Sequence, residues 1–356
     1  MIITGLTARA VNVPLDYPVR TSVGTVATAP LVLIDIGTDR GIVGRSYVFT
    51  YTPLALAAVR ELLSALGEAL AGYPAAPAEI DRLLEGRFRL LGATGLVRMA
   101  MAGIDMALWD AAAHHLGVPL VEMLGGTRRP IPAYDSHSMD GETLAVERAK
   151  QAAGQGFTAI KTKIGYATLA EDIRVIRAIR AAIGDGVQIL VDYNQSQSVP
   201  EAIRRGKALE SEGVAWIEEP TRQEDYLGHA RIREALALPV QMGENWFGID
   251  EMTWALDAGA TDLAMPDAMK IGGVTGWLRA AALAQSRGIP MSSHIFQEVS
   301  CHLMAVTPTA HLLERMDLAA PILDRPLRFE AGSALIPDRP GTGIGWNEAA
   351  VERYAV

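Results

Sequence analysis

Three acidic residues recur at equal intervals in this sequence: Asp192, Glu218 and Glu244 stand 26 residues apart. Each ends a short, largely apolar run, as in VQILVD, VAWIE and PVQMGE. If these runs are neighbouring strands, their carboxylates converge on one point and require a cation to offset the repulsion. An all-oxygen ligand set suits Mg2+ or Mn2+ better than Zn2+. The alternative for each residue alone is a solvated loop carboxylate.

Two lysines share one face of another predicted strand. In AIKTKIG the side chains of Lys161 and Lys163 point the same way, because successive residues of a strand alternate. Two ammonium groups at this spacing repel, so we expect one to lose its proton more readily and act as a base. The other would bind a substrate anion. The alternative is a pair of edge-strand lysines that face water and oppose aggregation.

A carboxylate and a histidine fall on two neighbouring predicted strands further along the chain, which begin near residues 263 and 289. Asp267 and His294 could form a dyad in which the carboxylate orients the imidazole and raises its basicity. The strands of Lys163 and His294 lie on roughly opposite sides of a closed eight-stranded barrel. Two bases placed in this way could remove a proton from one face of a carbon and return it from the other, which inverts a stereocentre. This is 1,1-proton transfer.

The elements that must position these residues repeat along the chain. Eight strand-like runs begin near residues 130, 158, 187, 214, 239, 263, 289 and 311, with helical stretches between them. Alternating strands and helices predict a parallel sheet closed into a barrel, whose active site lies at the carboxyl ends of the strands. The last run has little helix after it. We therefore expect an α/β fold with a (β/α)7β-type modified TIM barrel over residues 126–320.

Residues 1–125 predict a separate α+β capping domain, with a strand pair in LVLIDIGTDRGIVGRSYVF and a core helix near 96–120. Residues 17–30 resemble a mobile loop that forms a substrate-specificity lid. Residues 321–356 are expected to return to the capping domain.

Composition excludes several classes of partner. The formal net charge is −9, and no block of basic residues offers a nucleic-acid surface. No segment predicts a signal peptide or a membrane span. The single cysteine, Cys301, fits a reducing cytosol, so we expect a cytoplasmic protein in which this thiol is a buried spectator.

The motifs KTKIG, VDYNQS, WIEEP, MGENW, MPDAMKIGGVTGW and SSHIFQE together resemble the mandelate racemase subgroup of the enolase superfamily. The resemblance is nearly collinear from VNVPL to IPDRPGTGI. It implies a racemase that interconverts (R)- and (S)-mandelate, or a close 2-hydroxy-2-arylacetate, through an enediolate. It also implies Mg2+ on Asp192, Glu218 and Glu244, and a homo-oligomer, specifically an octamer.

The resemblance assigns roles to single residues. It implies that Lys163 is the base for the S enantiomer and that His294, paired with Asp267, is the base for the R enantiomer. Lys161 would neutralise the substrate carboxylate. Further implied are a protonated Glu314 that donates a hydrogen bond to the enediolate, an Asn194 that contacts the substrate hydroxyl, and a phenyl pocket of Val19, Val26, Phe49, Tyr51 and Leu90.

The predicted lid departs from the subgroup at Asp16, Arg20 and Ser22, where a more polar surface could admit a more hydrophilic 2-hydroxy acid. The main alternative is therefore an acid-sugar dehydratase of the same superfamily. A barrel that binds without catalysis is a third reading, which the full set of reactive residues disfavours.

Overall fold

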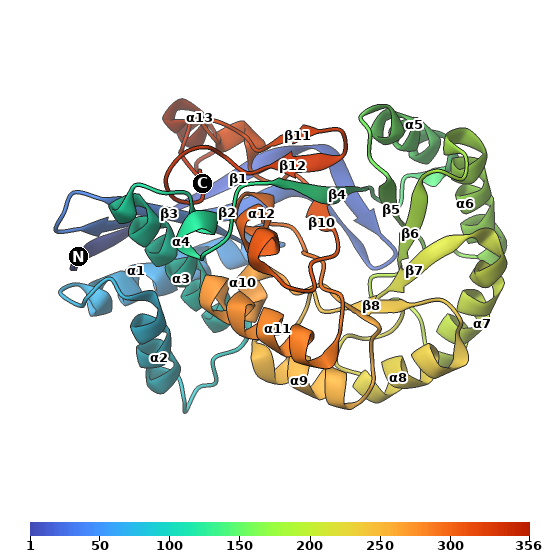
Figure 1. The fold of residues 1–356 in the computed structure, drawn as a ribbon, viewed down its shortest axis with the longest axis horizontal. Coiled ribbons are helices and arrows are strands. Elements are labelled where there is room, and N and C mark those ends of the chain that lie inside the picture. Colours follow the sequence, from blue (N-terminus) through green and yellow to red (C-terminus); the bar gives the residue numbers. More distant parts are fainter.

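The computed structural model describes residues 1–356 and consists of a capping domain beside a barrel (Figure 1). The capping domain is a three-stranded antiparallel sheet in the order β1-β2-β3, covered by helices. Its longest helix, α3, buries most of its side chains and ends at Gly117, whose left-handed backbone favours glycine. The predicted core helix is confirmed. No helix is both long and apolar enough to cross a membrane. The elements are β1 (Ile3–Thr21), β2 (Gly24–Thr38), β3 (Val43–Phe49), η1 (Pro53–Ala55), α1 (Leu56–Leu70), α2 (Pro77–Arg87), α3 (Gly95–Leu116) and α4 (Leu120–Met123).

The barrel strands run parallel in chain order, and the predicted eight runs are confirmed. Six runs form β4 to β9, and the eighth forms β10, which pairs with β4 and closes the ring. The seventh run contributes single bridges instead of a full strand, from Met291 to Ala264 and from His294 to Asp267. The strands are β4 (Pro130–Ser136), β5 (Ala159–Lys163), β6 (Gln188–Asp192), β7 (Val214–Glu218), β8 (Val240–Met242), β9 (Leu263–Ala264) and β10 (Leu313–Arg315).

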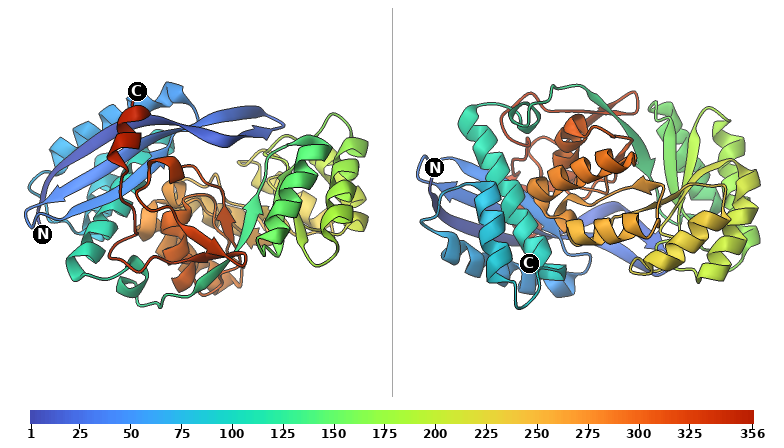
Figure 2. Two further views of the ribbon diagram at one scale, coloured as in Figure 1. Left: turned by 90° about the horizontal axis from the view of Figure 1, so that it is seen from above. Right: turned by 60° about the horizontal axis from the view of Figure 1, so that its bottom comes forward.

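Helices follow seven of the eight runs and cover the outside of the barrel (Figure 2). Their ends follow ordinary capping chemistry: Thr168 and Glu171 form a reciprocal capping box at the start of α6. The (β/α)7β prediction is therefore confirmed. The helices are α5 (Gly141–Gly154), α6 (Leu169–Ile183), α7 (Val199–Leu209), η2 (Glu210–Glu212), α8 (Tyr226–Ala235), α9 (Ile249–Asp257), α10 (Ala268–Ile271), α11 (Gly273–Arg287) and α12 (Gln297–Val306).

The segment predicted as a mobile lid loop is a β-hairpin instead. The ends of β1 and β2 pair from Val19 with Val26 to Thr21 with Gly24. The hairpin reaches across to the barrel, where Ser22 Oγ donates to the Tyr193 carbonyl at 3.1 Å and Met139 N donates to the Arg20 carbonyl at 2.9 Å. Small and polar residues in this segment suggested a loop, but cross-strand pairing and docking on the barrel keep its backbone extended.

The last segment of the chain contacts both parts of the protein. Strand β12 pairs antiparallel with the start of β4, and Asn12 N of β1 donates to the Tyr354 carbonyl at 2.9 Å. Figure 2 shows the C-terminal helix lying across the long strands of the capping sheet. The elements are η3 (Ala320–Ile322), β11 (Arg328–Glu330), β12 (Ser333–Leu335) and α13 (Glu348–Arg353).

Candidate active site

The three predicted metal ligands meet at the carboxyl end of the barrel. Asp192 and Glu218 are the last residues of β6 and β7 and pair in register, while Glu244 follows β8. All three are buried, and one oxygen from each lies within 4.8 Å of the others. Glu244 Oε2 is buried and accepts no hydrogen bond, although His294 Nε2 lies 3.3 Å away, so a bound cation would compensate its charge. This set of carboxylate oxygens fits Mg2+.

Both lysines of β5 point into this cluster, and without the charge of a bound metal the pKa of Lys163 is raised and not lowered as expected. Burial lowers the pKa of Lys163 and so does Lys161, but the carboxylates of Asp192, 2.5 Å from Lys163 Nζ, Glu244 and Glu218 together outweigh them and raise that pKa. Lys161 Nζ lies 2.6 Å from Glu218 and 2.8 Å from Glu314. Carboxylates on adjacent strands therefore outweigh the repulsion between the lysines.

The predicted dyad is present. His294 Nδ1 lies 2.8 Å from Asp267 Oδ2, and His294 Nε2 lies 3.3 Å from Glu244 Oε2. The other carboxylate oxygen of Asp267 accepts hydrogen bonds from the backbone N–H groups of Met269 and Lys270 at the start of α10. Burial lowers the pKa of His294, but Glu244 and Asp267 more than offset this and raise it. Asp267 is thereby fixed, and it fixes the imidazole.

Glu314 differs from expectation in its charge. Burial raises its pKa, but Lys161 and His294 outweigh burial and leave the pKa of Glu314 well below its usual value. Its Oε2 also accepts from the Ile295 backbone N–H at 2.9 Å. Without metal and substrate the pKa of Glu314 is thus lowered, because β10 places Glu314 against Lys161; its expected role as a protonated donor to the enediolate stays a prediction.

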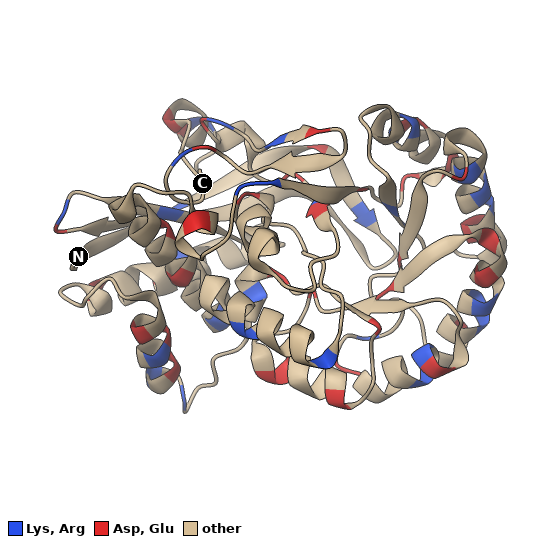
Figure 3. Cartoon of the chain, viewed as in Figure 1, with Lys and Arg blue, Asp and Glu red and all other residues tan.

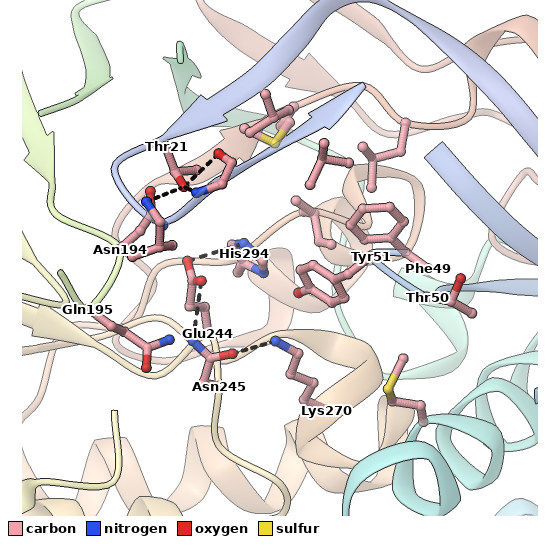
Figure 4. A pocket seen from close by; sticks show the side chains of 18 of the residues that line it. Thr21, Phe49, Thr50, Tyr51, Asn194, Gln195, Glu244, Asn245, Lys270 and His294 are labelled. Atoms are coloured by element: carbon pink, nitrogen blue, oxygen red, sulfur yellow. Dashed lines mark hydrogen bonds and ion pairs between the residues drawn. The ribbon is translucent and has the colours of Figure 1, made fainter. Parts of the chain in front are cut away.

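A cavity of about 610 Å³ opens above these groups, between the barrel and the hairpin. Lys163, Asn194, Glu244 and His294 line its polar side. Figure 4 labels the last three of these residues. Asn194 has a left-handed backbone, and its Oδ1 is buried without a partner. The apolar side includes four predicted residues and several that we did not predict: Val19, Val26, Phe49, Tyr51, Leu96, Met99, Ile295, Met316 and Leu318.

The prediction that Leu90 lines the phenyl pocket is wrong. Its side chain is fully exposed in the loop before α3 and does not line the cavity. A leucine in a loop can face either way, and only the observed backbone path decides. The three lid departures also stay outside the cavity: Asp16 lines a smaller, separate hollow, Arg20 lies 3.5 Å from Asp140, and Ser22 bonds to Tyr193.

Sequence reasoning gave no role to Asn245, Gln195 and Lys270, all of which line the cavity floor. Asn245 Nδ2 donates to both oxygens of Glu219, at 2.9 and 2.8 Å, and its Oδ1 accepts from Lys270 Nζ at 2.6 Å. Their positions just past β6, β8 and β9 were the available signal. Cys301 is fully buried, and burial raises the pKa of its thiol.

Comparison with known proteins places two family models on this chain. Residues 3–125 match the mandelate racemase/muconate lactonizing enzyme N-terminal domain, and residues 144–350 match the enolase C-terminal domain-like model. An enolase from Bradyrhizobium, solved in complex with magnesium and mandelic acid, superposes with a TM-score of 0.97 at 46% identity, covering 100% of this chain and 98% of that one.

Two curated relatives have different activities. An L-talarate/galactarate dehydratase from Salmonella typhimurium is 34% identical over 73% of this chain and 66% of its own length. A D-galactarolactone cycloisomerase from Agrobacterium fabrum is 32% identical over 99% of both chains. The proteins that this chain resembles therefore carry out more than one reaction.

Proposed function

Because the chain belongs to the mandelate racemase/muconate lactonizing enzyme family of the enolase superfamily, a Mg2+-dependent group acting on carboxylates, we propose that it racemises mandelate or a close 2-hydroxy-2-arylacetate. The observation that carries this proposal is that Lys163 and His294, from β5 and from the seventh run of the barrel, line the same cavity. Inversion requires a proton-transfer group on each face of the α carbon, and this pair of residues could supply both.

In this proposal Mg2+, held by Asp192, Glu218 and Glu244, supplies positive charge that favours the negative charge developing on the substrate carboxylate. Lys163 removes the α proton of the S enantiomer, and His294 returns a proton to the opposite face. In the reverse direction the two exchange roles. Asp267 holds the imidazole so that Nε2 faces the cavity. Asn194 contacts the substrate hydroxyl.

Lys161 and Glu314 would meet the substrate carboxylate. Lys161 is fully buried and carries its charge on the floor of the barrel, where it can neutralise a carboxylate bound above it. A second carboxylate beside Glu314 would raise its pKa by repulsion. Glu314 could then take up the proton that it needs to donate a hydrogen bond as charge develops.

The apolar side of the cavity supports an aryl substituent. Phe49 and Tyr51 pack with ring centroids 4.4 Å apart, and Val19 and Val26 of the hairpin cover the same space. The polar lid residues that raised doubt do not reach it. The relative from Bradyrhizobium was solved with mandelic acid, which agrees with this choice.

The experiment is incubation of the Mg2+-loaded protein with (R)-mandelate in D2O. We expect decay of the optical signal to zero together with deuterium at the α carbon of both enantiomers. If the optical signal persists and the α proton does not exchange, the proposal is rejected. The double variant Lys163→Met and His294→Asn is the control for background exchange.

A second candidate, an acid-sugar dehydratase, is supported by the cavity floor. Gln195, Asn245 and Lys270 could hydrogen-bond to a polyol, and the relative from Salmonella is a dehydratase. A screen of hexarate and pentonate sugar acids for 2-keto products tests it. Dehydration of any of these acids faster than mandelate racemises would replace the first proposal by the second.

A further inference from the structure

Lys270 is a buried cation that the proposed racemisation does not use. It is 4% exposed, and its ammonium forms no ion pair with a carboxylate. Instead, Nζ donates to Asn245 Oδ1 at 2.6 Å and lies 4.4 Å from the centre of the Tyr51 ring. A buried ammonium that satisfies its charge through an amide and an aromatic face is held at a cost, so a compensating role is expected.

The Asn245 amide, which Lys270 contacts, also contacts a proposed metal ligand. Asn245 Nδ2 donates to both oxygens of Glu219 and also lies 3.3 Å from Glu244 Oε1. Figure 4 shows Lys270, Asn245, Glu244 and His294 linked in this order. Glu244 is thus held between the Asn245 amide on one oxygen and the His294 imidazole on the other.

The orientation of the Asn245 amide depends on Lys270. With its oxygen towards the ammonium, the amide presents its NH2 group to the two glutamates, and all of its partners are matched. A flipped amide would place an oxygen against two carboxylates and an NH2 group against a cation. The positive charge of Lys270 therefore selects the one amide orientation that supports Glu244.

We propose that Lys270 is a positioning residue for the metal site: acting through the Asn245 amide, it holds the Glu244 carboxylate in place to bind Mg2+. Groups that orient a metal ligand typically affect metal affinity by about ten- to a hundredfold when removed. The proposal concerns metal binding alone, so it holds or fails independently of whether the enzyme is a racemase or a dehydratase.

The test is a calorimetric titration of the metal-free protein with Mg2+ alone, which measures Mg2+ affinity. We expect Lys270→Met, which keeps the apolar stem, to weaken Mg2+ binding about tenfold. Lys270→Arg keeps the charge and should recover at least part of the affinity. Lys150→Met, which removes an exposed ammonium from α5, is the matched control and should bind Mg2+ like the wild type.

A double-mutant cycle separates positioning from general destabilisation. If Lys270 acts through the amide, Lys270→Met has no further effect on Mg2+ affinity when Asn245 is already replaced by Leu. Wild-type affinity in Lys270→Met, or independent effects that multiply in the double variant, would overturn the proposal. If Lys270→Met does not fold, Asn245→Leu alone must show the tenfold loss, and its absence would count equally against the proposal.

Discussion

Lys163 Nζ lies 2.5 Å from Asp192 Oδ2, so a proposed base and a metal ligand are hydrogen-bonded partners across the β5–β6 pair. With Mg2+ bound, Asp192 would face two cations at once. A metal ion bound to the three carboxylates would be attracted by the same Asp192 charge that pairs with the Lys163 ammonium. Metal binding and the state of the base are therefore linked.

Because of this linkage, we expect removal of the metal to affect both activity and stability. Chelation should abolish turnover, and added Mg2+ should restore it and raise the stability of the folded chain. At a Mg2+ concentration of about 100 times Kd, binding contributes roughly 2.7 kcal/mol. Thermal unfolding with and without Mg2+ measures this gain. Asp192→Asn should show a much smaller gain, and an equal gain would contradict the ligand assignment.

Replacing one base at a time should separate the two half-reactions. In Lys163→Met we expect racemisation to fall by about a thousandfold while (R)-mandelate still exchanges its α proton with D2O, because His294 remains. In His294→Asn only (S)-mandelate should exchange. NMR of each enantiomer in D2O gives both rates. Exchange of both enantiomers in either single variant would contradict the two-base arrangement.

The anchor of the hairpin can be tested without touching the cavity. Ser22→Ala removes the hydrogen bond to the Tyr193 carbonyl, a net contribution of about 1 kcal/mol. We expect a several-fold rise in KM and a small fall in the melting temperature, because the bond holds the hairpin over the cavity. Ser64→Ala, which loses an equivalent bond to Arg60 within α1, is the control and should leave KM unchanged.

Asp105 gives a pH dependence remote from the metal site. This carboxylate on α3 accepts hydrogen bonds from the Thr275 backbone N–H and hydroxyl on α11, and burial raises its pKa to about 7. Because the folded pKa is the higher one, the proton is bound more tightly in the folded state. Its contribution to stability is complete below pH 4 and is lost as pH rises through 7.

Asp105→Asn removes this titration while keeping an acceptor for Thr275. Urea unfolding at pH 5 and pH 8 should show a smaller fall in stability for the variant than for the wild type. For Asp185→Asn, at a fully exposed position, the stability should fall between pH 5 and pH 8 as it does for the wild type. An unchanged pH dependence in Asp105→Asn would show that another group titrates.

The parts of the fold that depend on spacing could be predicted from the sequence. Eight runs at intervals of roughly 25 residues required a closed barrel, and strand ends placed Asp192, Glu218 and Glu244 together. The Asp267 and His294 dyad followed from neighbouring runs. These predictions rest on the periodicity of βα units, which is written locally along the chain.

The failures have a common physical origin in contacts between distant segments. The charge states of Lys163 and Glu314 depend on which side chains lie within 3 Å, and the hairpin depends on pairing between β1 and β2. The exposure of the Leu90 side chain depends on the path of one loop. No local pattern in the sequence encodes such contacts.

The pairing of β10 with β4 has a consequence for how the protein is made. Glu314 and Tyr134 stand opposite each other although 180 residues separate them in the chain. Contacts between such distant residues form late and slowly in folding. During synthesis the ribosome therefore releases almost the whole barrel before Lys161 can meet Glu314, and a nascent chain that stops short of β10 lacks one of the two carboxylates that pair with Lys161. Catalytic competence would then appear abruptly, with the last strand, and not accumulate as the chain grows.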